Sequence, residues 1–245
     1  EISLGLVGSE MCIRDRGIKM VLEAINFDKL DKLYVSESAF DRTAQRLGDK
    51  LERIPYEVVA DNVFKQISDT VTPQGVLATV NMPEYDVKEI LSDERKAWVL
   101  LDDLRDPGNL GTIIRTSEGA GMSGVIMSKE SVDLFNPKVV RSTMGAIFRV
   151  KFCYVESLID IIEEIKKSGY DVYATAMEGS EVYDCVDYTK GSAFIIGNEA
   201  NGVSDAVFEK ASKRIRIPME GKLESLNAAV SAAIIMYEMA RQKRK

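Results

Sequence analysis

The stretch DDLRDPGNLGTIIRTSEGAG, residues 102–121, follows the apolar run AWVLL and carries the strongest local indication of the fold. Its polar start marks the end of a buried strand, and Pro-Gly-Asn at 107–109 is typical of a turn. A helical pattern follows, with Arg115 placed among isoleucines, and Gly119 and Gly121 end it before the next apolar run. The stretch predicts a strand–turn–helix–strand unit, the repeating element of an α/β fold.

Apolar runs alternate with helical patterns throughout residues 97–245. The runs are continuous rather than strictly alternating, as expected of strands covered on both faces. We expect strands at 97–104, 124–128, 149–155, 171–177, 192–197 and 214–219, and a last helix at 225–242. The region therefore predicts a mostly parallel, three-layer α/β domain.

The remaining chain divides into three further parts. Residues 17–80 alternate short helices and strands and predict a separate, small α/β domain. The charged segment 81–96 lacks a long apolar stripe, so we expect a linker with a short helix around 87–91. Residues 1–16 have no consistent period, and MCIRDR within them is what a common sequencing-adapter sequence would encode. We therefore expect residues 1–16 to be a non-native segment that replaces a first strand.

Composition excludes several kinds of chemistry. The chain has 245 residues, a net charge of −7 and no histidine, which excludes Ser-His-Asp and Cys-His catalysis and removes the commonest metal ligand. Cys12, Cys153 and Cys185 are far apart and form no metal-binding pair, so we expect reduced thiols, a cytoplasmic protein and no metal site. No apolar run approaches the roughly 20 residues of a membrane span, so no membrane partner is expected.

Gly119, Gly121 and Gly124 have the spacing of a dinucleotide-binding fingerprint. That fingerprint leaves a strand and opens a helix, whereas these glycines close a helix and lead into a strand. We interpret them as a helix C-cap and turn. A nicotinamide-dependent oxidoreductase is therefore disfavoured.

Three loops rich in glycine and polar residues follow predicted strands. Besides residues 102–121, they are FIIGNEANGVS at 194–204 and IRIPMEGKLESLNAAVSAA at 215–233. Ligands of open α/β sheets bind outside the carboxyl ends of the strands. Glycine allows a backbone to approach a ligand closely, and Asn, Glu and Ser supply donors and acceptors. The three loops therefore predict one shared site.

These three segments resemble the ordered motifs of the SpoU (TrmH) family of RNA ribose 2′-O-methyltransferases, from residue 106 to residue 234. The resemblance implies a C-terminal SPOUT domain whose chain is threaded as a trefoil knot, with S-adenosyl-L-methionine as cofactor. Residues 17–80 resemble, more weakly, the family's L30e-like RNA-binding domain. The third motif departs from the family at residues 228–229, where small residues replace small residues, so we expect only helix packing to adjust.

The resemblance also implies the roles of individual residues. Arg115 is expected to bind the target's phosphate or oxyanion and is a candidate acceptor of its proton, although a guanidinium normally stays protonated. Asn109 is expected to orient Arg115 or the ribose, and Glu199 to anchor its loop or an arginine. The other implied catalytic residues, which fix the loop that carries the cofactor, are Ser225 and Asn227. The implied cofactor-binding residues are Thr175, Ala176, Gly197, Ile217 and Leu226.

The implied partners are RNA and a second copy of the chain. The N-terminal domain favours ribosomal RNA; the alternatives are a tRNA 2′-O-methyltransferase and a non-catalytic RNA-binding member of the fold. Family members are homodimers with the site completed near the subunit interface. Because the net charge is negative, RNA contacts must come from local basic residues. The candidates are Lys138, Arg141, Arg149 and the tail at 241–245.

Overall fold

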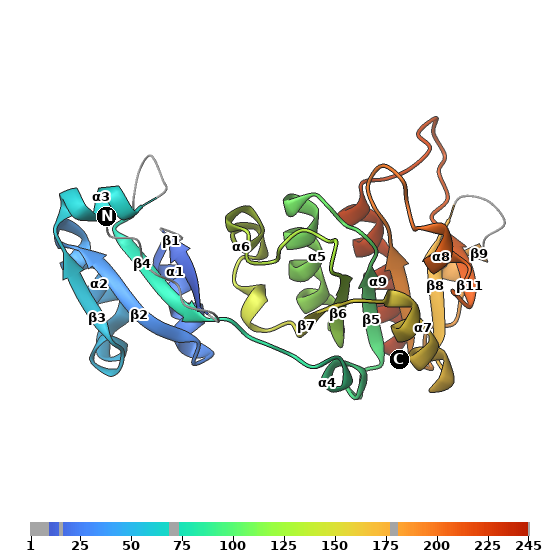
Figure 1. The fold of residues 1–245 in the computed structure, drawn as a ribbon, viewed down its shortest axis with the longest axis horizontal. Coiled ribbons are helices and arrows are strands. Elements are labelled where there is room, and N and C mark those ends of the chain that lie inside the picture. Colours follow the sequence, from blue (N-terminus) through green and yellow to red (C-terminus); the bar gives the residue numbers. More distant parts are fainter. Residues whose placement is uncertain (1–9, 15–16, 69–73, 177–180, 245) are drawn as a thin grey trace. The chain divides into compact units, whose positions relative to one another are not determined.

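The computed structural model describes residues 10–14, 17–68, 74–176 and 181–244 (Figure 1). The chain divides between Pro83 and Glu84 into two compact units. Most of the segment predicted to be non-native lies outside the described residues. Its residues 10–14 form strand β1 (Glu10–Arg14), which pairs antiparallel with β4 (Val76–Asn81). The foreign origin of residues 1–16 stays a prediction.

The N-terminal unit is a small α/β domain with a four-stranded sheet in the order β1-β4-β2-β3. Strands β2 and β4 are antiparallel, whereas β2 and β3 are parallel. Helix α1 buries one face against the sheet, as its apolar spacing predicts. The other elements are α1 (Gly17–Asn26), β2 (Leu30–Ser36), η1 (Glu37–Ala39), α2 (Phe40–Leu47), η2 (Gly48–Arg53), β3 (Tyr56–Val59) and α3 (Asp61–Ile67).

Most of the predicted linker belongs to the C-terminal unit. Helix α4 (Val87–Leu91) forms where a short helix was expected. Its Ile90 is fully buried in the hydrophobic core of the C-terminal unit, and the Ile90 carbonyl accepts a 3.0 Å hydrogen bond from Trp98 Nε1. Residues 84–96 of the predicted linker therefore belong to the C-terminal unit, because Ile90 is buried in its core and Tyr85, Val87 and Leu91 pack against that core.

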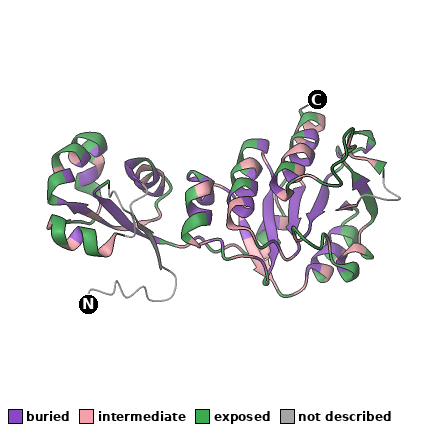
Figure 2. Ribbon diagram, turned by 90° about the horizontal axis from the view of Figure 1, so that it is seen from above, coloured by how far each residue is buried: buried purple, intermediate pink, exposed green. Residues whose placement is uncertain are grey.

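The C-terminal unit is built on a seven-stranded sheet in the order β7-β6-β5-β10-β8-β11-β9, with every pair parallel. Strands β5, β6 and β10 are buried along their whole length (Figure 2). The strands are β5 (Ala97–Leu101), β6 (Gly124–Ser128), β7 (Phe152–Val155), β8 (Asp171–Thr175), β9 (Glu181–Val182), β10 (Ser192–Ile196) and β11 (Lys213–Arg216). Six of these were predicted from apolar runs, whereas the two-residue β9 has no such run.

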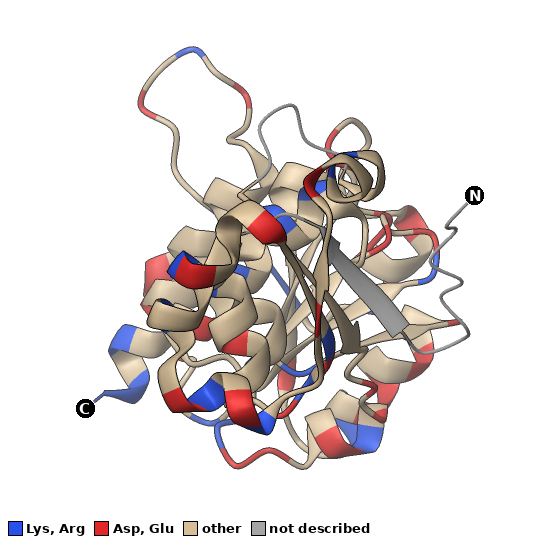
Figure 3. Ribbon diagram, turned by 90° about the vertical axis from the view of Figure 1, so that its left-hand side faces the viewer, with Lys and Arg blue, Asp and Glu red and all other residues tan. Residues whose placement is uncertain are grey.

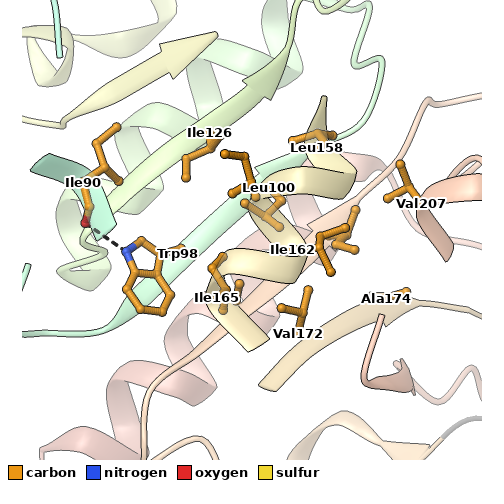
Figure 4. Close-up of a cluster of buried hydrophobic side chains, with 13 residues drawn as sticks. Ile90, Trp98, Leu100, Ile126, Leu158, Ile162, Ile165, Val172, Ala174 and Val207 are labelled. Carbon is orange, nitrogen blue, oxygen red and sulfur yellow. Dashed lines mark hydrogen bonds between the residues drawn. The ribbon is translucent and has the colours of Figure 1, made fainter. Parts of the chain in front are cut away.

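Helices cover both faces of this sheet, which confirms the three-layer prediction. Helices α4, α7 and α8 pack on one face around a buried core (Figure 4). Helices α5 and α9 contact each other and strands of the sheet, and α6 packs against α5. The helices not yet bounded are α5 (Pro107–Ala120), α6 (Pro137–Thr143), η3 (Ala146–Phe148), α7 (Leu158–Lys167), η4 (Tyr183–Cys185), α8 (Asp205–Phe208) and α9 (Ala228–Lys243).

Acidic and basic residues are interspersed along the chain (Figure 3). Several of them pair across elements, as Lys32 does with Glu57 and Lys210 with Glu163. A net negative charge is therefore compatible with local basic patches on the surface. Within the described ranges, none of the helices is long and apolar enough to cross a membrane.

Candidate active site

The carboxyl ends of neighbouring strands meet at one edge of the parallel sheet. β5, β10, β8 and β11 lie side by side and run in the same direction. The loops that follow β10 and β11, together with the end of β8, surround a cavity of about 680 Å³. The loop after β5 lies against the loop after β10. The predicted convergence of the three motif loops is therefore observed.

The cavity is lined by all five residues predicted to bind the cofactor. Apolar side chains come from Ile196, Met219 and Leu223 in addition to the predicted Ile217 and Leu226. The predicted residues in the lining are Thr175, Ala176, Gly197, Ile217 and Leu226. Glu199, Ser225 and Asn227 line it as well.

Glu199, Asn109 and Asn227 join the three motif loops in one hydrogen-bonded chain. Asn109 Nδ2 donates to Glu199 Oε1 at 2.9 Å, and Asn227 Nδ2 donates to Asn109 Oδ1 at 2.9 Å. Asn227 is also the N-cap of α9, where its Oδ1 accepts from the Ala229 and Val230 amides. Asn109 therefore uses both ends of its amide to hold the second and third motifs beside the first.

Glu199 fixes the loop after β5 through its whole carboxylate. Oε2 accepts from the Arg105 amide at 3.1 Å, and Oε1 accepts from the Asp106 amide at 2.9 Å in addition to Asn109. Partial burial alone would raise the pKa of Glu199, but the hydrogen bonds from Asn109, Asp106 and Arg105 outweigh burial and lower the pKa. Glu199 therefore stays ionised and accepts hydrogen bonds rather than a proton.

The Glu199→Gln substitution is expected to lower the free energy of unfolding at pH 7 by about 1 kcal/mol, because charge-assisted hydrogen bonds are lost. Because the pKa of Glu199 is lower in the folded state than its ordinary value of 4.5, ionised Glu199 stabilises the fold at pH values above 4.5. This stabilisation is lost as the pH falls through the folded-state pKa. The wild type and the variant should therefore differ at pH 7, and the difference should become smaller as the pH falls through the folded-state pKa of Glu199. Urea denaturation over a series of pH values from 7 downward measures this.

Glu224→Gln is the matched control for Glu199→Gln, because Glu224 also lines the cavity but makes no hydrogen bond to the described residues. Equal losses in the two variants at pH 7 would contradict the role given to the Glu199 carboxylate.

Gly197 is required by close packing of its own loop. A Cβ at this position would overlap the main chain of Gly202 and Val203. Asn198 and Gly202 form an isolated antiparallel bridge with hydrogen bonds of 2.9 and 2.8 Å, and Gly202 has φ 71°. The loop thus folds back on Gly197, which leaves the main chain at the cavity wall without a side chain.

Asn109 and Arg115 both lie on α5, whose start differs from the sequence prediction. Pro107 is in the first turn of the helix and Asp106 is its N-cap, accepting from the Asn109 amide at 2.8 Å. The prediction of a turn at Pro-Gly-Asn, residues 107–109, is therefore wrong. These residues form the first turn of α5, a position that proline also favours. The predicted end of the helix is confirmed, since Gly121 is a left-handed C-cap with φ 70°.

Arg115 does not line the cavity. It is exposed on α5, whereas its neighbours Ile113 and Ile114 are fully buried, as the sequence predicted. Within the part of the chain that the structure describes, its side chain has no hydrogen bond or ion pair. The expected contact between Asn109 and Arg115 is therefore not observed, and Arg115 is available to a ligand outside the cavity.

Two positioning residues, Asp102 and Asn198, are absent from the set predicted from the motifs. Asp102 is buried, and its Oδ2 accepts from both the amide and the hydroxyl of Ser204 at 2.7 Å. Asn198 Nδ2 donates to the Asp103 carbonyl at 2.9 Å. Two features of the sequence could have indicated them: Asp102 directly follows a buried strand, and Asn198 directly follows Gly197.

Several predicted RNA-contacting residues have other partners. Arg149 pairs with Glu118 at 3.1 Å, and Arg241 pairs with Glu238 at 2.7 Å. Lys243 Nζ donates to the Lys96 carbonyl at 2.9 Å and holds the end of α9 against the start of β5. Of these residues, Lys243 therefore attaches the last helix to the sheet, whereas the Arg241–Glu238 pair lies within that helix.

Lys138 and Arg141 remain exposed on α6. Lys138 Nζ lies 3.9 Å from Asp106 Oδ2, a loose ion pair and the one polar contact of the Lys138 side chain among the described residues. Because α6 packs against α5, both residues share a neighbourhood with the helix that carries Arg115.

S-adenosylmethionine fits the cavity by size and lining. Ligand cavities usually measure roughly 300–1,000 Å³ and combine apolar walls with a few polar groups. The cavity is lined by apolar side chains from Ile196, Ile217 and Leu226, by the main chain of Gly197 and by the polar residue Ser225. Apolar walls and main-chain groups suit a purine ring, and the polar groups suit an amino-acid moiety.

Known proteins resemble the chain in both units. The SpoU rRNA Methylase family model matches residues 96–237, and the model for RNA 2′-O ribose methyltransferase substrate binding matches residues 16–86. The 23S rRNA (guanosine(2553)-2′-O)-methyltransferase RlmP of Bacillus subtilis is 37% identical over 182 residues, which cover 74% of this chain and 71% of RlmP.

Two solved structures resemble the chain along nearly its full length. The SpoU methyltransferase AviRb from Streptomyces viridochromogenes in complex with AdoMet has a TM-score of 0.84 and 28% identity, covering 96% of this chain and 91% of AviRb. The AdoMet-bound rRNA methyltransferase from Sinorhizobium meliloti has a TM-score of 0.81 and 31% identity, covering 95% of this chain and 87% of that protein. The chain belongs to the SpoU rRNA methylase family.

Proposed function

We propose that this protein transfers a methyl group from S-adenosylmethionine to the 2′-hydroxyl of a ribose in RNA. The hydrogen-bonded chain Glu199–Asn109–Asn227 carries the proposal, because it joins all three motif loops beside a cavity of suitable size. Family membership and the AdoMet complexes of two similar structures support it. A non-catalytic RNA-binding protein is disfavoured, since such a protein has no need of a cofactor cavity with this network.

The bound cofactor supplies an electrophilic methyl group. The chain's own residues hold the cofactor and present the RNA. Gly197, Ile217 and Leu226 would hold the cofactor through apolar and main-chain contacts, with Thr175 and Ala176 at the end of β8. Ser225 contributes a hydroxyl to the cavity wall. Water exclusion by this wall would strengthen the electrostatic interactions inside.

Arg115 is proposed to bind the phosphate or the developing oxyanion of the target ribose. A guanidinium offers several donors in fixed geometry and suits both groups. Its exposure and its lack of a partner among the described residues support this role. Glu199 and Asn109 are proposed as positioning residues, because their polar atoms are already used to hold the loops.

The RNA is proposed to be ribosomal. RlmP acts on 23S rRNA, and its similarity extends over 74% of this chain. The substrate-binding model matches residues 16–86, which gives the chain a second surface for a large RNA. Exposed Lys138 and Arg141 on α6 supply phosphate contacts near α5. A tRNA substrate is the alternative, and comparing methyl transfer to unmodified rRNA and tRNA distinguishes them.

A homodimer in the cytoplasm is also proposed, with the C-terminal segment threaded as a trefoil knot as the family resemblance implies. Val230 and Tyr237 are 47% and 48% exposed and lie two turns apart on α9, while Met144 is 59% exposed. Exposed apolar residues on one helix face suit a second copy of the chain. The resemblance implies that the site is completed near the subunit interface of such a dimer. Analytical ultracentrifugation measures the oligomeric state.

Cofactor choice tests the proposed function cheaply. Calorimetry should show binding of S-adenosylmethionine and no binding of NAD, because the glycines at 119–124 close α5 rather than cradle a pyrophosphate. Binding of NAD without S-adenosylmethionine would overturn the proposal.

A further inference from the structure

The loop between β11 and α9, residues 217–226, forms one wall of the cavity but is attached mainly at its ends. Apolar side chains at Ile217, Met219, Leu223 and Leu226 line the cavity. Within the described parts of the chain, no hydrogen bond holds residues 218–226. The segment that follows β11 extends away from the packed elements of its unit (Figure 1). Segments with few hydrogen bonds and high exposure have low local stability.

The two ends of the 217–226 loop are fixed. Before it, β11 pairs with β8 through Ile215. After it, Asn227 is bound to Asn109 and caps α9. Movement of the loop is therefore confined to a segment whose ends stay at the cavity.

Leu223 is an apolar residue whose side chain is largely exposed to solvent. It is 71% exposed, the highest value among the large hydrophobic residues that the structure describes, and yet it lines the cavity. Gly221, two residues earlier, has open space around the position of a Cβ. Covering an apolar side chain with a ligand is favourable, so a bound molecule would draw Leu223 inward.

We propose that residues 218–225 close over the cavity when S-adenosylmethionine binds, and that Leu223 is a further binding residue that covers the ligand. The proposal rests on the proposed function and adds a contact to the same site. S-adenosylmethionine has apolar faces. Leu223 lines the cavity but is largely exposed, so the cavity is open to solvent where Leu223 lies. Closure also removes water from the site where the methyl group is transferred.

Two measurements on the full chain test this proposal. Hydrogen–deuterium exchange should slow in peptides that cover residues 218–226 when S-adenosylmethionine is added. Calorimetry should show that Leu223→Ala weakens binding of S-adenosylmethionine about tenfold, because the apolar contact is lost. Leu223→Met keeps the side-chain volume and should bind within about twofold of the wild type.

Val58→Ala is the matched control, since it truncates an aliphatic side chain that is 43% exposed on β3 of the other unit. It should leave the affinity for S-adenosylmethionine unchanged. Leu223→Ala should unfold at the same temperature as the wild type, because its side chain is largely exposed.

The outcomes separate the two proposals. If the wild type does not bind S-adenosylmethionine, the proposed function is wrong. If the wild type binds it but exchange at residues 218–226 does not change and Leu223→Ala binds equally well, closure is wrong. Protection that depends on protein concentration instead of the ligand would mean that a second copy covers Leu223, which also overturns closure.

Discussion

Replacing Arg115 with alanine is expected to reduce methyl transfer by about 10²–10³-fold, the usual effect of removing one preorganised group that stabilises developing charge. Affinity for S-adenosylmethionine should stay within about twofold, because Arg115 does not line the cavity. Stability should not change, since the exposed side chain has no partner among the described residues. Single-turnover methyl transfer, calorimetry and thermal unfolding measure these three quantities separately.

Two further variants sharpen the Arg115 experiment. Arg115→Lys keeps the charge but loses the planar donor geometry, so it should recover only part of the activity. Lys167→Ala removes another exposed positive charge in the last turn of α7, which precedes the amino end of β8 and lies at the opposite edge of the sheet. It should leave transfer unchanged. Full activity in Arg115→Ala would remove this residue from the mechanism.

Gly197→Ala is expected to weaken cofactor binding strongly. A Cβ would overlap the main chain of Gly202 and Val203, and these atoms cannot move aside as a flexible side chain can. Displacing this main chain costs about 1–3 kcal/mol. It also moves Glu199, so the contacts to α5 weaken with it. We expect affinity for S-adenosylmethionine to fall about 100-fold, the equivalent of nearly 3 kcal/mol.

Gly119→Ala is the matched control for Gly197→Ala. Gly119 lies within α5, where alanine is favourable, and its added Cβ would approach only Tyr237 Oη, at 3.2 Å. Tyr237 can adjust because the contact is at the end of its side chain. Calorimetry should show unchanged cofactor affinity in Gly119→Ala. Equal affinity in Gly197→Ala and the wild type would contradict the packing of the loop after β10.

Six of the seven strands of the C-terminal sheet could be predicted from the sequence, because continuous apolar runs are a strong signal of buried parallel strands. The local structure could not be predicted where a residue is compatible with two conformations. Pro107 suits both a turn and the first turn of a helix, and only the Asp106 cap decides between them. Ile90 shows the same limit, since its burial depends on Trp98 and the core around it rather than on its own segment.

The site residues were predicted as a set, but not their contacts. Asn109 lies 90 residues from Glu199 and 118 from Asn227 in sequence, so their hydrogen bonds exist only after the sheet has formed. Asn109 was expected to orient Arg115 or the ribose, and the structure shows no contact between Asn109 and Arg115 among the described residues. Six residues along a helix do not bring two side chains to the same face, and Arg115 is exposed whereas Asn109 is buried.

The most direct test of the central claim is to map ribose 2′-O-methyl groups on unmodified ribosomal RNA after incubation with the purified protein. With S-adenosylmethionine present, the account predicts a new 2′-O-methyl group at a defined nucleotide, and its formation should be about 10²–10³-fold slower when Arg115→Ala replaces the wild type. Methylation confined to a base, or no methylation of ribosomal or transfer RNA by a protein that binds S-adenosylmethionine, would contradict it.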